Sequence, residues 1–184
     1  MSRVVPPRTT DSPAGDRAPT ALVLGGEVAR TMTLTVADLR AGWRQHRVEV
    51  TFDCATSGVR HHTFEGPLLR EVAADAGPAF DARRRKDRCH FLLTVTGLDG
   101  HHTVLTWAEM DPDFGGAPIV LATRMDGTDL DVAGSQLVVS TDRCGARYVS
   151  RITRIWIGRC TAGQCEPPTA RGRRSRESAA VLSP

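Results

Sequence analysis

The sequence contains no long hydrophobic segment. No stretch approaches the length of a membrane-spanning helix, and the first residues lack the apolar core of a secretion signal. We therefore expect a cytoplasmic protein with no membrane partner. The five cysteines are an odd number in a chain without a secretion signal, so we expect reduced thiols rather than a disulfide framework.

Signatures of several common active sites are also missing. The cysteines and histidines include no C-x2-C or H-x3-H pair, which argues against a four-ligand zinc site. Ser57 lacks the Gly-x-Ser-x-Gly surroundings of a hydrolase nucleophile. His61-His62 and His101-His102 fall on expected strands, where adjacent side chains point to opposite faces, so neither pair can chelate one ion. A metal site formed by one histidine from each pair, on neighbouring strands, stays open.

The remaining cysteine pattern is weak. Cys160 and Cys165 form a C-x4-C pair in a segment that contains glycine. We interpret them as loop thiols and Cys89 as a core residue, because a second close pair of ligands is absent. A redox pair of Cys160 and Cys165 stays open, since such a segment is able to close it.

Charge is nearly balanced over the chain, with 24 Lys and Arg residues, 21 Asp and Glu residues and a net charge of +3. The basic run Arg83-Arg84-Arg85-Lys86, followed by Arg88, has no interleaved aromatic residues. A charge run between two elements is typical of a solvated loop. We therefore do not expect a nucleic-acid partner.

Composition divides the chain into three parts. Residues 1–20 are rich in Pro, Ser, Thr, Gly and charged residues, and residues 160–184 lose their apolar periodicity in the same way. We expect both to be disordered tails, the second of them basic. Residues 21–159 are numerous enough for one domain with its own hydrophobic core.

Alternating apolar and polar residues with many β-branched side chains predict a strand-rich domain. The expected strands are residues 21–27, 31–34, 46–54, 60–64, 88–97, 101–107, 119–125, 136–140 and 151–157. The expected helices are residues 36–41, residues 67–76 with Pro67 at the first helical position, and residues 107–110. This pattern predicts an α+β fold with a mixed, mainly antiparallel sheet or barrel-like core. Trp107 and Trp156 are expected to pack in that core.

Cys54 lies where an expected strand meets a loop. The run from His46 to Cys54 alternates polar and apolar residues, and Thr56-Ser57-Gly58 then ends the strand. A strand fixes the side chain while a loop keeps it accessible, so the position suits a metal ligand or a nucleophile. Because small buried cysteines are also common at strand ends, the position alone does not decide between chemistry and packing.

A second segment near the other end of the domain, Gly145-Ala146-Arg147-Tyr148-Val149, runs from a turn into a β-prone stretch. Together with Val50-Thr51-Phe52-Asp53-Cys54-Ala55, it resembles the molybdenum-cofactor domain of the sulfite oxidase family. Intermediate segments at 34–40, 66–72 and 119–127 resemble the family in the same order. The resemblance extends from about Ala21 to Arg159.

The resemblance implies a molybdopterin-dependent oxidoreductase with a molybdenum–molybdopterin cofactor. Cys54 would be the thiolate ligand to molybdenum, which accepts soft donors. Arg147 would hold the pterin phosphate, for which arginine has suitable bidentate geometry, with Gly145 and Arg151 beside it. The implied chemistry is two-electron oxygen-atom transfer, with the electrons passed to an unidentified acceptor or to a partner subunit that completes the site.

The sequence departs from the family pattern at several points. Only residues 55–65 separate Cys54 from Gly66-Pro67, where the family has a long excursion that builds the substrate pocket. Residues 1–20 match none of the family's N-terminal pterin contacts, and Ser150 stands where a basic residue is usual. These departures support an alternative, a non-catalytic binding or interaction module that has kept the scaffold without the cofactor. The sequence therefore leaves open whether the chain is an enzyme.

Overall fold

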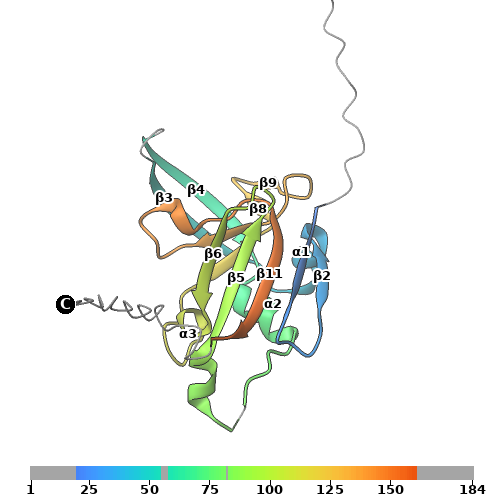
Figure 1. Cartoon of the computed structure of the whole chain (residues 1–184). Helices are drawn as coiled ribbons and strands as arrows, with labels where there is room; N and C mark the ends of the chain where they lie inside the picture. The colour runs from blue at the N-terminus through green and yellow to red at the C-terminus, as the bar shows by residue number, and fades with distance from the viewer. Residues whose placement is uncertain (1–19, 55–57, 82, 161–184) are drawn as a thin grey trace, which may run out of the picture.

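Strands dominate the computed structural model of this chain, which describes residues 20–54, 58–81 and 83–160 (Figure 1). For residues 52–54 and 58 it describes the course of the backbone only. The described residues form three sheets and a few short helices, and none of these sheets closes into a barrel. The parallel pairing of β1 with β11 is the exception among otherwise antiparallel pairings. The α+β prediction with a mixed, mainly antiparallel sheet is confirmed.

The largest sheet has five strands in the order β2-β1-β11-β5-β6. Its strands are β1 (Ala21–Gly26), β2 (Met32–Thr35), β5 (Phe91–Gly97), β6 (His102–Thr106) and β11 (Ile152–Arg159). One face of the sheet is buried, because alternate residues such as Leu93, Val95, Ile155 and Ile157 point into the core.

A second sheet has four strands in the order β3-β4-β8-β9. Its strands are β3 (His46–Cys54), β4 (Gly58–Gly66), β8 (Arg124–Met125) and β9 (Thr128–Asp129). The first two make a long hairpin that pairs residue by residue from His46 opposite Gly66 to Cys54 opposite Gly58. The outer ends of β3 and β4 project from the body of the domain (Figure 1).

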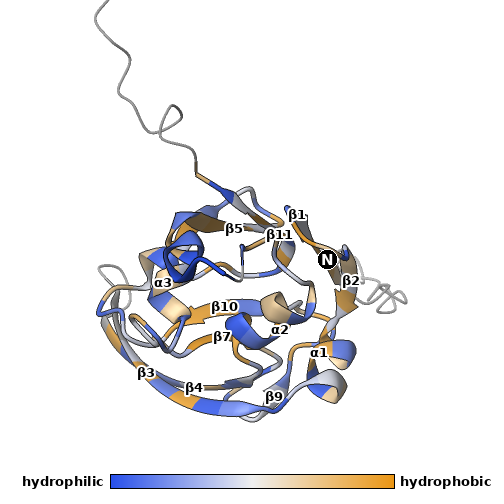
Figure 2. Ribbon diagram, turned by 90° about the horizontal axis from the view of Figure 1, so that it is seen from below, coloured by the Kyte–Doolittle hydropathy of each residue, from blue (hydrophilic) through white to orange (hydrophobic). Residues whose placement is uncertain are grey.

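A two-stranded ribbon, β7 (Ile119–Ala122) and β10 (Gln136–Val139), lies between the two larger sheets (Figure 2). All four residues of β7 are buried. Ile119 and Leu121 belong to the core against the five-stranded sheet, whereas Val120 and Ala122 belong to the core against the β3–β4 hairpin. The ribbon therefore separates two hydrophobic cores and is covered on both faces.

Short helices and 3-10 turns join the strands. They are α1 (Val36–Gly42), α2 (Leu69–Asp75) and α3 (Trp107–Met110), with 3-10 turns η1 (Arg85–His90) and η2 (Gly145–Arg147). Thr35 and Asp38 form a capping box at the start of α1, as their spacing predicts. The described part of the chain contains no helix with the length and apolar character needed to cross a bilayer.

Three predicted elements differ from those observed. The second helix begins at Leu69 instead of Pro67, because the Pro67 carbonyl accepts a hydrogen bond from the Leu121 amide at 2.9 Å and this part of the chain stays extended. The strand predicted for 88–97 begins only at Phe91, since the preceding residues form η1. The strand predicted for 119–125 breaks at Thr123, so β7 and β8 belong to different sheets.

Two predicted core residues are in fact exposed. Trp107 is buried as expected, but Trp156 keeps 36% of its surface exposed. Because Ile155 and Ile157 point inward, Trp156 faces outward and its ring lies over Gly158. Cys89 is also exposed, because it lies on η1 rather than on a strand.

The expectation of reduced thiols is correct for two cysteines and wrong for a third. Cys89 and Cys144 are free. Cys160 is disulfide-bonded. Cys165 lies outside the described residues, so the alternative of a redox pair of Cys160 and Cys165 stays open.

Gly66 is required where β4 passes the central ribbon. A Cβ atom at this position would lie 2.0 Å from the Leu121 carbonyl oxygen, which is part of the backbone and has no freedom to move aside. We expect Gly66→Ala to lower the free energy of unfolding by about 2 kcal/mol or more, measured by denaturant unfolding. Gly42→Ala is the matched control, because its added Cβ would meet no atom within 4 Å beyond its chain neighbours and the backbone of its own helix. Equal stability of the two variants would contradict the close approach of β4 and β7.

Asp87 joins η1 to the last strand. Its buried carboxylate accepts two hydrogen bonds from Arg159, at 2.5 and 2.8 Å, and one from the Asp81 amide. The Arg159 hydrogen bonds are the main reason why the pKa of Asp87 lies far below its ordinary value. A carboxyl whose pKa is lowered by folding stabilises the folded state above its unfolded pKa and loses this effect as pH falls.

We therefore expect Asp87→Asn to lower the melting temperature at neutral pH, with a difference from the native chain that narrows below about pH 4. Thermal unfolding of both proteins across this range measures the difference. A difference that stays constant from neutral pH to about pH 3 would show that the ion pair is not its cause.

Candidate functional site

Cys54 is the last residue of β3, on the projecting end of the β3–β4 hairpin. Its backbone pairs with that of Gly58, and residues 55–57 between them lie outside the described residues, as does the Cys54 side chain. The predicted strand that ends at this cysteine is confirmed. The predicted role of its thiol stays a prediction.

Arg147 lies on η2, where its guanidinium group contacts two carboxylates. It donates from Nε and Nη2 to the two oxygens of Asp142, at 2.8 and 2.6 Å, and from Nη1 to Glu109 Oε1 at 2.8 Å. These hydrogen bonds, first those to Asp142 and then that to Glu109, raise the pKa of Arg147. We call these three residues the Arg147 clamp.

Glu109 is positioned by its own helix. Its Oε2 atom accepts a hydrogen bond from the Thr106 amide at 2.7 Å, and the Thr106 hydroxyl accepts one from the Glu109 amide, which makes a capping box at the start of α3. The other oxygen, Oε1, is the one that contacts Arg147. One carboxylate therefore both begins α3 and fastens η2 to it.

The chain after Arg147 is also fixed to the ribbon. The Tyr148 hydroxyl donates to the Val139 carbonyl at 3.1 Å, and Val149 is buried and pairs with Leu137 of β10. Arg151 has a left-handed backbone with φ of 51°, and its Nε donates to the Ala133 carbonyl at 3.2 Å. Arg147 and Arg151 therefore contact different parts of the molecule.

The fold brings η2 beside β3, although the two elements are far apart in sequence (Figure 1). Tyr148, which follows η2, packs in the same core as Val48 and Val50 of β3. The fold thus places the strand that ends at Cys54 beside the Gly145-Ala146-Arg147 segment. Gly145 begins η2. His101 contacts the same turn, with its Nε2 atom 3.1 Å from the Ala146 carbonyl oxygen.

Sequence reasoning missed both carboxylates of the Arg147 clamp. The Thr106-x-x-Glu109 spacing is the signal for the capping box that fixes Glu109, as Thr35-x-x-Asp38 is for α1. Nothing in the sequence indicates that the second oxygen of Glu109 contacts Arg147, because this contact depends on tertiary structure. Asp142 is nearer to Arg147 in the sequence, five residues before it, but opposite charge alone does not identify it as the partner of Arg147.

His61 and His62 lie on β4 and are separated as predicted for adjacent strand residues, whereas His101, predicted to lie on a strand, lies just before β6. His61 Nδ1 contacts the Thr51 hydroxyl at 2.9 Å, whereas His62 Nδ1 contacts Asp126 Oδ2 at 2.7 Å. Over the described ranges, no three His, Cys, Asp or Glu side chains are grouped so that they could hold a metal ion.

Of the two predicted contacts with a molybdenum–pterin cofactor, the cysteine fits the metal, whereas Arg147 in its present contacts does not fit the phosphate. A cysteine at the end of a strand is the kind of soft ligand that molybdenum accepts. A guanidinium group has five N–H donors, of which the carboxylates of the Arg147 clamp take three. Two carboxylates against one guanidinium leave an excess of negative charge, so a phosphate would have to displace one of them, and this arrangement does not fit an anion.

Comparisons with known proteins agree with the sequence resemblance. The family model described as the oxidoreductase molybdopterin binding domain matches residues 10–159. The crystal structure of the sulfane dehydrogenase SoxCD from Paracoccus pantotrophus superposes with a TM-score of 0.59 at 19% sequence identity, over 77% of this chain and 38% of that chain. The chain thus spans well under half of that protein's length. A comparison with curated proteins finds no match.

Tyr148 offers a direct probe of the surroundings of η2, because it is the single tyrosine in the sequence. Burial, followed by the charge of Asp142, raises the pKa of Tyr148 to about 12. We expect a tyrosinate absorbance titration of the folded chain to show little ionisation near pH 10, where a free tyrosine is half ionised. Unfolding in denaturant should return the pKa of Tyr148 to the ordinary value of a tyrosine.

Asp142→Asn should lower the pKa of Tyr148 only in part, because burial is the larger cause. Asp99→Asn, which alters a carboxylate on the β5–β6 turn, serves as the control and should leave the titration unchanged. An ordinary pKa for Tyr148 in the folded native chain would contradict the described packing of this residue.

Proposed function

Since the chain belongs to the oxidoreductase molybdopterin-binding domain family, we propose that it binds a molybdenum–molybdopterin cofactor and supports two-electron redox chemistry. The family match over residues 10–159 carries this proposal, because it includes every described element from β1 to β11. When bound, the cofactor supplies oxygen-atom transfer at molybdenum. The protein supplies a ligand, orientation and the surroundings of the metal.

Cys54 is the proposed metal ligand. Its backbone lies at the end of the long β3–β4 hairpin, where pairing with β4 holds the direction of the strand. A thiolate at this position provides the anionic sulfur donor that molybdenum requires from the protein. The packing of Val50 and Phe64 in the second core fixes the base of the hairpin relative to the ribbon.

Arg147, Gly145 and Arg151 are the proposed cofactor-binding residues, with Arg147 at the phosphate. In the described arrangement two of the N–H donors of Arg147 are not used by the clamp, and Glu109 holds it through one contact only. We propose that the phosphate replaces Glu109, which keeps its capping role at Thr106. Arg151 would have to leave the Ala133 carbonyl to take part.

The electron acceptor is proposed to be a separate protein or subunit. The match covers 38% of the SoxCD chain, and the described residues include no group of three His, Cys, Asp or Glu side chains that could hold a second metal ion. A partner that completes the site fits both observations.

A second candidate function has an observation in its favour. The Arg147 clamp carries an excess of negative charge, and such a site repels a phosphate unless a carboxylate moves. A non-catalytic binding or interaction module, in which Arg147 fastens η2 to α3, needs no such movement. The two candidates differ in whether the purified chain carries molybdenum.

We expect the full chain, purified from a host that makes the cofactor, to contain molybdenum at close to one atom per chain by mass spectrometry. Cys54→Ser should lose most of this molybdenum, because an alcohol is a harder and less acidic ligand than a thiol. Cys144→Ser is the matched control, since Cys144 is a free, exposed thiol next to η2 and should keep the metal.

Three results would count against the cofactor proposal. Absence of molybdenum from the native chain would favour the non-catalytic module. Equal molybdenum in native chain and Cys54→Ser would remove Cys54 as the ligand. Loss of molybdenum in Cys144→Ser but not in Cys54→Ser would identify Cys144, instead of Cys54, as the metal ligand.

A further inference from the structure

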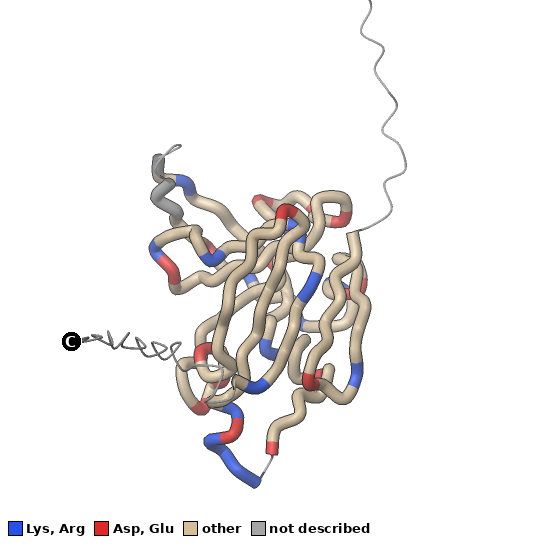
Figure 3. The backbone as a smooth tube through the Cα atoms, viewed as in Figure 1, with Lys and Arg blue, Asp and Glu red and all other residues tan. Residues whose placement is uncertain are grey.

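A cavity lies at the end of the domain opposite the outer ends of β3 and β4. In Figure 1 the segment from α2 to η1 forms the lower end of the molecule, while the hairpin with Cys54 projects from the upper end. Figure 3 shows basic residues gathered along this lower segment. The cavity has a volume of about 410 Å³ and is lined by Pro78, Phe80, Asp81, Arg84, Arg85 and Arg88.

Phe80 gives this cavity a rigid apolar wall. Its ring packs edge-on against Phe91, with centroids 4.7 Å apart, and against Trp107, with centroids 4.6 Å apart. Two steeply inclined aromatic neighbours hold the ring in one orientation, and the ring lines the cavity, so it offers a stacking surface without further ordering. Pro78 extends this wall, and its backbone is held by a bridge to Val28.

The arginines of the cavity differ in how far their charge is already neutralised. Arg88 donates to Asp111 and to Asp113, each at 2.6 Å. Arg85 Nε lies 3.8 Å from Asp113 Oδ2, and 75% of the Arg85 side chain is exposed. Arg84 has no ion pair with any described residue. The cavity therefore contains one cation without a carboxylate partner and a second that is only weakly paired.

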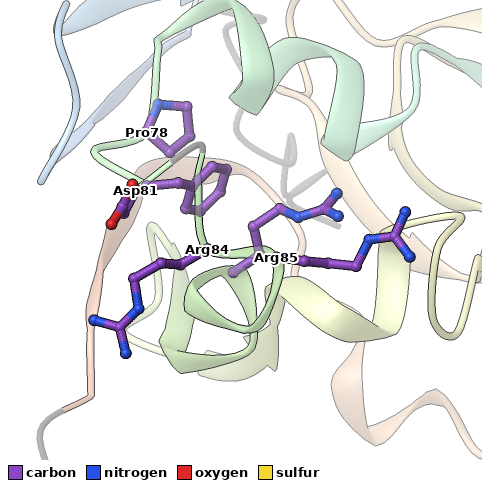
Figure 4. Close-up of a pocket in the computed structure, with 6 residues that line it drawn as sticks. Pro78, Asp81, Arg84 and Arg85 are labelled. Carbon is purple, nitrogen blue, oxygen red and sulfur yellow. The ribbon is translucent and has the colours of Figure 1, made fainter.

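Asp81 adds a hydrogen-bond acceptor to the same wall. One of its carboxylate oxygens accepts a hydrogen bond from the Arg83 amide at 3.0 Å, which leaves its second oxygen for other donors. Figure 4 shows Asp81 and Arg84 extending to one side of the cavity and Arg85 to the other. A hydroxyl group suits a carboxylate, whereas a phosphate suits the unpaired guanidinium of Arg84.

We propose that this cavity binds a mononucleotide. The flat base would stack on Phe80 beside Pro78, a ribose hydroxyl would donate to Asp81, and the phosphate would accept hydrogen bonds from Arg84. A volume of about 410 Å³ is within the range of small-ligand pockets. The proposal does not depend on the molybdenum cofactor, because it uses residues at the other end of the domain.

The test is calorimetric titration of the purified full chain with adenosine monophosphate, adenosine and inorganic phosphate. We expect adenosine monophosphate to bind more tightly than either fragment, because it uses both the aromatic wall and Arg84. Arg84→Gln should weaken its binding about tenfold or more, the effect of losing a charge-assisted hydrogen bond. Arg83→Gln removes the same charge from a neighbouring position that does not line the cavity, and its affinity should stay within about twofold of the native value.

Phe80→Leu tests the stacking contribution. It should weaken the binding of adenosine monophosphate and leave the affinity for inorganic phosphate unchanged. Thermal unfolding checks that the variant is folded. The proposal is overturned if adenosine monophosphate does not bind the native chain. It is also overturned if Arg83→Gln weakens binding as much as Arg84→Gln, or if phosphate alone binds as tightly as the nucleotide, since both indicate a general attraction of anions to the basic segment.

Discussion

The β7–β10 ribbon is the part of the structure on which the rest depends. Two strands alone are marginally stable in water, so hydrogen bonds within the ribbon do not hold it in place. Its apolar residues are buried on both faces, and burial of one such side chain contributes about 1.5–3 kcal/mol. One core fastens the ribbon to the five-stranded sheet and the other to the β3–β4 hairpin. Gly66 allows β4 to approach Leu121 closely enough for the second core to form.

Both parts of the candidate site are built outward from this ribbon. The second core fixes the base of the hairpin that ends at Cys54, while β10 leads through a turn to η2 and Arg147. The chain enters β7 from α3, which contributes Glu109 to the Arg147 clamp. The clamp therefore ties the segment that enters β7 to the segment that leaves β10, at the end of the ribbon where Ile119 pairs with Val139. Charge balance at this clamp decides between the two candidate functions, since a phosphate binds Arg147 only after a carboxylate has moved.

Much of this architecture could be predicted from the sequence, and the failures have identifiable causes. Alternation predicted β3, β5 and β11, and capping chemistry predicted α1, because both signals are local. The break at Thr123 was missed, because a continuous apolar run does not reveal which sheet each residue joins. The expectation that Trp156 packs in the core is wrong, because its position between Ile155 and Ile157 on β11 points it outward. At the candidate site, the family resemblance indicated Cys54 and Arg147, but the contact of Glu109 with Arg147 is tertiary and has no local signal.

The most direct test of the proposed function is X-ray absorption at the molybdenum edge of the purified full chain. It counts the sulfur atoms bound to the metal, which the metal content of the protein does not reveal. A domain that holds molybdenum through Cys54 should show one more sulfur ligand in the native chain than in any molybdenum retained by Cys54→Ser. Equal sulfur counts in the two proteins would contradict the assignment of Cys54 and, with it, the proposed site at the end of β3.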